Sequence, residues 1–191
     1  MKKIFYSAWA AVLFSCQPSH SPLSESEQSV FLAKGDSIAT QSQLALLGHV
    51  SAQMKAGGAS QAVNFCNEKA IPLTDSLSQN YQVEIQRLTD KNRNPNNTLS
   101  TEQDKEAWQQ LFTQMQSKTM PNHLLIEGED AVYYYKAIPL GMPTCLACHG
   151  NPSKDIAPET LAIISSKYPE DKAIGYTQGE LRGMWKIKMN K

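Results

Sequence analysis

The stretch LLIE-GED-AVYYYKAI, residues 124–138, consists of two apolar segments on either side of a Gly-Glu-Asp turn and predicts a β-hairpin. Residues 83–88 and 184–189 alternate apolar and polar side chains, which is the period of a β-strand. We therefore expect a small sheet whose strands come from the middle and the end of the chain.

Helical periodicity dominates the region before these strands. Apolar residues recur at helical spacing over about residues 26–56, and Gly57 and Gly58 then end the pattern. Three further helices are expected, at about residues 59–79 with a kink or an interruption at Pro72, at about 100–119 and near 158–167. Helices followed by strands, with a loop inserted between strands, favour an α+β fold in which N-terminal helices pack on an antiparallel sheet.

The start of the chain predicts export. Residues 1–15 join two lysines to an uncharged apolar run, which is typical of a secretory signal and shorter than the about twenty residues of a membrane span. Leu13-Phe14-Ser15-Cys16 resembles a bacterial lipobox, so we expect cleavage before Cys16 and lipid attachment to its sulfur. The alternative is a plain secretory signal with an incidental cysteine.

A polar segment, residues 16–29, predicts a flexible tether between the lipid and a folded domain at residues 30–191. We expect the protein in the periplasm, anchored by lipid to a bacterial membrane, with the outer membrane favoured. The chain has 191 residues, with 18 basic and 18 acidic side chains. This balance argues against a nucleic-acid partner, which normally requires a basic surplus.

Residues 145–149, Cys-Leu-Ala-Cys-His, form a C-x-x-C-H motif, the signature of c-type haem attachment. Two thiols three positions apart reach the two vinyl groups of one haem, and the next residue supplies an imidazole to the iron. The motif therefore predicts one covalent haem c, with Cys145 and Cys148 as attachment points and His149 as the proximal iron ligand.

Other uses of this motif fit the sequence less well. Residues 150–152, Gly-Asn-Pro, prevent the long helix that a thioredoxin-type pair normally opens. A structural zinc site needs four ligands, usually in two pairs, and the sequence has no second C-x-x-C. A disulfide between Cys145 and Cys148 would leave His149 without a role.

Cys66 is the cysteine that neither the lipid nor the haem motif uses. One interpretation is a small buried hydrophobe on the inner face of the second helix. The other is the sixth ligand of the iron, which would shelter the thiol from oxidation. Competing candidates for the distal ligand are His49, His123, Met54, Met115, Met120 and Met142.

Five segments, in order along the chain, resemble a family of secreted PAS-like domains that carry haem c and occur alone or in bacterial sensor proteins. These segments are AVNFC at 62–66, RLTDKNRNPNN at 87–97, YKAIP at 135–139, CLACHG at 145–150 and YPEDKAIGY at 168–176. The resemblance covers about residues 30–190. It implies a PAS-like antiparallel sheet with an inserted haem-attachment loop, and it makes Cys66 the expected partner of His149 across the iron.

Arg93 is a candidate for binding a haem propionate, because a guanidinium group holds a carboxylate through two hydrogen bonds. Arg87 and Lys136 are further candidates, and for each of the three the alternative is an exposed charge or a structural bond. With Cys66 and His149 both on the iron, no position is open for a substrate. We therefore expect electron transfer or redox or gas sensing, with a separate redox or signalling protein as partner, rather than an enzyme.

The alternative function is a peroxidase-like haem enzyme with an open distal site. It requires that Cys66 does not bind the iron and that a histidine acts as acid and base above it. His49 and His123 are the candidates for that role.

Overall fold

A computed structural model of the chain describes residues 22–118 and 120–191. The predicted signal at residues 1–15 and the predicted lipid site at Cys16 lie outside the described residues. Within the described part, no helix combines the length and the apolar character needed to cross a membrane.

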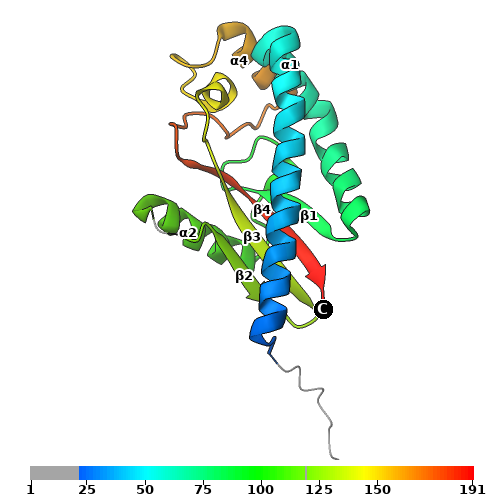
Figure 1. The fold of residues 1–191 in the computed structure, drawn as a ribbon. Coiled ribbons are helices and arrows are strands. Elements are labelled where there is room, and N and C mark those ends of the chain that lie inside the picture. The colour runs from blue at the N-terminus through cyan, green and yellow to red at the C-terminus, as the bar shows by residue number, and fades with distance from the viewer. Residues whose placement is uncertain (1–21, 119) are drawn as a thin grey trace, which may run out of the picture.

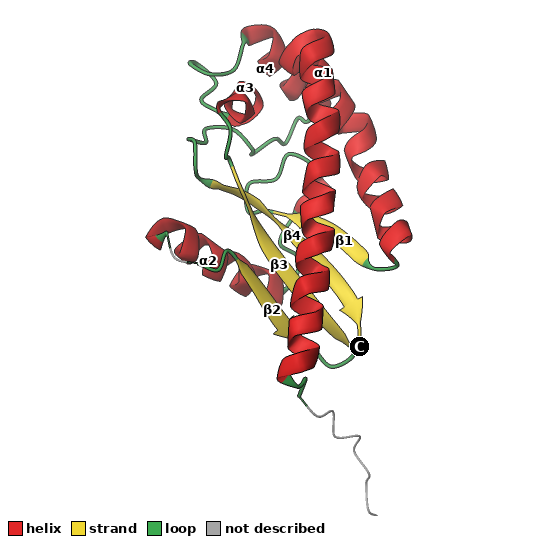
Figure 2. Ribbon diagram, viewed as in Figure 1, coloured by secondary structure: helices red, strands yellow, loops and turns green. Residues whose placement is uncertain are grey.

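Four antiparallel strands form one sheet in the order β1-β4-β3-β2 (Figure 2). The strands are β1 (Glu84–Leu88), β2 (His123–Glu127), β3 (Ala131–Pro139) and β4 (Leu181–Asn190). The predicted hairpin is confirmed as β2 and β3. The last strand begins at Leu181, earlier than residue 184, because a shift in register beside Ile138 lets Leu181 pair with Pro139.

Helix α1 (Glu25–Tyr81) consists of two arms that meet at Gly57 and Gly58, the two positions with non-helical backbone angles. Gly58 has φ 72°, a left-handed conformation that favours glycine, and the chain reverses there (Figure 1). Ser24 and Glu27 form a capping box at the start of the first arm. Residues 25–29, which we assigned to the tether, are therefore helical.

The second arm continues as a helix through Pro72, so of the kink or interruption predicted there, the interruption is wrong. Proline removes the hydrogen bond to the carbonyl of Glu68, four residues earlier. Both Pro72 and Glu68 are exposed, so water can satisfy that carbonyl, and the helix is not broken.

The sheet lies between α1 on one face and α2 (Glu102–Ser117) on the other (Figure 1). The α1 face is built on Ile38, Ile85, Tyr134, Trp185 and Ile187. The α2 face is built on Leu88, Trp108, Leu111, Tyr135 and Met184. Neighbouring strand positions such as Tyr134 and Tyr135 point to opposite faces, so both sides of the sheet are apolar. The predicted α+β class is confirmed.

The connection between β3 and β4, residues 140–180, extends beyond the end of the sheet (Figure 2). It contains the 3-10 turn η2 (Pro143–Cys145) and the helices α3 (Leu146–His149) and α4 (Pro158–Lys167). Helix α4 packs against α1, and the hydroxyls of Ser60 and Thr160 form a hydrogen bond of 3.1 Å between them. The loop after β1, which includes the 3-10 turn η1 (Pro95–Asn97), approaches the same connection.

Candidate functional site

The C-x-x-C-H segment forms one helical turn beyond the sheet. Turn η2 runs directly into α3, and Pro143 at the first position suits the start of a helical turn. The turn closes at Gly150, whose N–H donates to the carbonyl of Leu146 at 2.8 Å. Residues three positions apart share a helix face, so Cys145 and Cys148 lie on one side of this turn. Both are free thiols and are half-buried.

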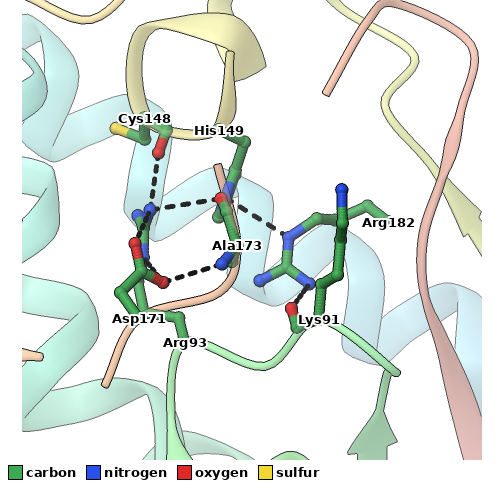
Figure 3. A network of polar contacts seen from close by, with 7 residues as sticks. All are labelled: Lys91, Arg93, Cys148, His149, Asp171, Ala173 and Arg182. Atoms are coloured by element: carbon green, nitrogen blue, oxygen red, sulfur yellow. Dashed lines mark hydrogen bonds and ion pairs between the residues drawn. The ribbon is translucent and has the colours of Figure 1, made fainter. Parts of the chain in front are cut away.

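His149 is held by a carbonyl from a distant part of the chain (Figure 3). Its Nδ1 lies 2.8 Å from the main-chain oxygen of Ala173. A carbonyl only accepts, so Nδ1 carries the hydrogen, and Nε2 keeps a free lone pair. Nε of Arg182 also lies 3.3 Å from Nδ1, but a protonated ring nitrogen cannot accept from it. The shorter contact with the carbonyl therefore decides the tautomer.

The imidazole of His149 is neutral near pH 7. Burial lowers its pKa well below the ordinary value, and the positive charges of Arg182 and Arg93 lower the pKa further. Tyr176 lies edge-on to the ring, with the two ring centres 6.4 Å apart. A neutral imidazole whose Nδ1 is hydrogen-bonded and whose Nε2 is free is the form in which histidine binds a metal ion.

Cys66 lies on the second arm of α1, close to the C-x-x-C-H turn. One helical turn before it, Val63 belongs to the apolar cluster against which Cys148 packs. Burial raises the pKa of the Cys148 thiol to about 11, and both Cys66 and Cys145 are near enough to raise it further. Cys66 is itself a free thiol whose pKa is raised by burial. The structure therefore brings three of the chain's cysteines into one region.

Arg93 is bound to protein groups on several sides (Figure 3). Its Nε and Nη2 donate to the two carboxylate oxygens of Asp171 at 3.1 and 3.0 Å. Nη2 also donates to the carbonyl of Cys148 at 2.7 Å and approaches that of Ala173 at 3.3 Å. These bonds join three segments of the site, and a propionate contact from Arg93 stays a prediction. Lys136 instead pairs with Asp36 of α1 at 2.7 Å.

The chain contains three arginines, Arg87, Arg93 and Arg182, and all of them lie here. Their positive charges act on both Cys66 and His149. Burial lowers the pKa of Arg182 to about 10. No pattern in the sequence identified Arg182 as a site residue. The signal that could have done so is composition, because the chain has only three arginines and fifteen lysines.

The structure gives several competing distal candidates other partners. His49 stacks on Phe65 with ring centres 5.5 Å apart, and His123 stacks on Tyr134 at the same distance. Met115 packs against the α2 face of the sheet. Met120 and Met142 are exposed large side chains. Among residues 22–118 and 120–191, no three His, Cys, Asp or Glu side chains group so as to hold a metal ion by themselves.

Comparisons with known proteins agree with this architecture. The crystal structure of the cyanobacterial haem protein Tll0287 superimposes with a TM-score of 0.61 at 22% sequence identity, covering 88% of this chain and 98% of that one. No curated protein matches the sequence. The profile of the Tll0287-like family matches residues 23–190, so the chain belongs to the Tll0287-like family.

Proposed function

We propose that the chain binds one haem c, covalently attached through Cys145 and Cys148, with Nε2 of His149 as the proximal iron ligand. The observation that carries this proposal is the hydrogen bond from Nδ1 of His149 to the carbonyl of Ala173, because it leaves Nε2 free to bind a metal ion. His149 directly follows Cys148, and the thiols of both Cys148 and Cys145 are free. The donor set fits the group: two thiols on one turn for the vinyl positions and a neutral imidazole for the iron. The relative Tll0287 is itself a haem protein.

The bound haem would supply a one-electron redox centre, and the chain's own residues would hold and tune it. Arg87 and Arg182 are candidates for its two carboxylates. Arg93 is already paired with Asp171. Within the described residues, neither Arg87 nor Arg182 forms an ion pair with a carboxylate of the protein. A guanidinium group suits a carboxylate better than a lysine does, because it offers two parallel N–H donors.

Cys66 is the proposed sixth ligand. Burial keeps its thiol protonated on its own, but the charges of Arg87, Arg93 and Arg182 act in the opposite direction and favour the thiolate. A nearby metal ion adds to this effect, because it deprotonates a coordinating thiol. A thiolate on the iron occupies the position that a substrate would need, which favours electron transfer or sensing over catalysis.

The proposed setting is the periplasmic side of a bacterial membrane, with a lipid on Cys16. This rests on the sequence of residues 1–16 and on the short segment that separates Cys16 from the start of α1 at Glu25. A redox or signalling protein is the proposed partner, since electron transfer and sensing both require one.

Absorption and electron paramagnetic resonance spectra of the oxidised full-length protein, produced in a host that attaches haem c, test the ligand set. The wild type should give a low-spin thiolate signal and bind carbon monoxide slowly when reduced. Cys66→Ala should lose that signal and bind carbon monoxide readily, whereas the matched control His49→Ala should behave as the wild type. An unchanged spectrum in Cys66→Ala contradicts the assignment of Cys66, and an altered one in His49→Ala contradicts the closed distal side.

A further inference from the structure

We propose that the buried ion pair of Arg93 and Asp171 positions His149, by holding the Ala173 carbonyl against the imidazole and thereby setting how strongly Nε2 donates to the iron. This inference rests on the proposed function. Neither side chain contacts Nε2, so both act as positioning residues.

The pair is anchored to the backbone on both sides of His149 (Figure 3). Oδ1 of Asp171 accepts the main-chain N–H of Ala173 at 2.9 Å as well as Nε of Arg93 at 3.1 Å. Nη2 of Arg93 donates to the carbonyl of Cys148, the residue before His149, at 2.7 Å. One guanidinium–carboxylate pair therefore joins the segment that carries the imidazole to the segment that carries its acceptor.

Two further main-chain bonds run alongside the imidazole contact. The N–H of Gly175 donates to Gly150 at 2.8 Å, and that of Tyr176 donates to His149 at 3.0 Å. Residues 173–176 thus follow the end of α3 closely. Without the ion pair these two bonds would remain, but the carbonyl of Ala173 would lose Nη2 of Arg93, which lies 3.3 Å from it, and the N–H of the same residue would lose its acceptor on Asp171.

The pair has the geometry for a rigid contact. The side chains of Arg93 and Asp171 are only 9% and 6% exposed, and the two hydrogen bonds between them run in parallel. The guanidinium carbon also lies 5.9 Å from the centre of the Tyr168 ring. A lysine has one ammonium group and cannot reproduce this fork, although it keeps the charge.

Hydrogen bonding at Nδ1 reaches the metal through the ring. A firm acceptor at Nδ1 raises the basicity of Nε2, and a more basic ligand stabilises the oxidised metal ion. Loosening the Ala173 carbonyl should therefore favour the reduced state. It should also let the Nδ1 proton exchange faster with water.

The test compares four full-length haem-loaded variants with the wild type: Arg93→Gln, Arg93→Lys, Asp171→Asn and the control Asp104→Asn. The control breaks another buried ion pair, the one between Lys186 and Asp104 on the α2 face. Two quantities are measured, the equilibrium constant for reduction by spectroelectrochemical titration and the exchange rate of the His149 Nδ1 proton by NMR.

Arg93→Gln should raise both quantities by about threefold or more, and Arg93→Lys should raise them less. Asp171→Asn should act in the same direction. If Arg93→Gln does not fold, the milder variants Arg93→Lys and Asp171→Asn test the prediction. Asp104→Asn should leave both quantities unchanged while lowering stability. The positioning role alone is overturned if the haem-loaded Arg93 and Asp171 variants match the wild type, or if Asp104→Asn changes both quantities equally. A wild type that carries no haem overturns the proposed function as well.

Discussion

Nδ1 of His149 lies 2.8 Å from the main-chain oxygen of Ala173, 24 residues further along the chain. This bond joins the C-x-x-C-H turn to the segment that leads into β4. It selects one tautomer of the imidazole and directs Nε2 away from the carbonyl, so the fold itself prepares the form in which a histidine can bind a metal ion.

Gly150→Ala should disturb this arrangement. A methyl group at Gly150 would lie 2.6 Å from Cβ of Asp155 and 2.7 Å from the carbonyl oxygen of Leu146, so α3 or the following loop would have to move. We expect a loss of about 1–3 kcal/mol in the free energy of unfolding. Urea denaturation followed by circular dichroism measures it. Gly141→Ala is the control, because an added methyl group there meets no atom within 4 Å, and a loss of equal size in both variants would contradict the clash at Gly150.

Gly35→Ala should separate the first arm of α1 from the sheet. A methyl group at Gly35 would lie 2.6 Å from Cβ of Tyr134, a β3 residue whose side chain is fully buried between α1 and the sheet. We expect a destabilisation of about 1–3 kcal/mol, visible as a lower denaturation midpoint in urea.

The control for this position is Gly48→Ala in the same arm of α1. Nothing lies within 4 Å of an added methyl group there, and alanine favours a helix over glycine by about 1 kcal/mol. Gly48→Ala should therefore be neutral or stabilising. If Gly35→Ala were equally harmless, the close contact between Gly35 and Tyr134 would be wrong.

The local patterns of the sequence predicted the strands and helices well, because their periods are properties of neighbouring residues. The alternation at residues 184–189 and the hairpin at 124–138 each identified a strand. Pro72 misled the prediction because its effect depends on whether the freed carbonyl faces water, and that depends on how α1 packs. The early start of β4 follows from a shift in its register with β3, and the alternation of residues within one strand does not predict such a shift.

The sequence could propose only the contiguous part of the candidate site. Cys145, Cys148 and His149 form one motif, whereas Arg93 and Asp171 meet over 78 residues of chain. The contacts of Arg182 with His149 and with Lys91 join β4 to α3 and to the loop after β1 in the same way. Only the fold brings such residues together, so their roles could not be derived from spacing.

Asp104 should make stability depend on pH. Burial alone raises the pKa of a carboxyl group, but hydrogen bonds from Lys186, Thr101 and Tyr135 outweigh burial and leave the pKa of Asp104 below its ordinary value. The ionised carboxylate therefore stabilises the fold above the unfolded pKa of about 3.9, and this contribution is lost as the pH falls through the lower folded pKa.

Asp104→Asn leaves Lys186 without its partner, and we expect a loss of about 3 kcal/mol or more in unfolding free energy at pH 7. The difference between the variant and the wild type should shrink as the pH is lowered from about 4 towards 2. Urea denaturation across this range measures it. A difference that stays constant over the whole range would show that the charge of Asp104 contributes nothing.

The intact mass of the purified full-length chain, made in a host that attaches haem c, tests covalent haem binding most directly. We predict the mass of the lipid-modified mature polypeptide plus one haem for the wild type, and the mass of the lipid-modified polypeptide without haem for the double variant Cys145→Ala and Cys148→Ala. The control is a known c-type cytochrome made in the same host, which should carry its haem. If that control carries haem and the wild-type chain does not, haem attachment at these two cysteines is contradicted.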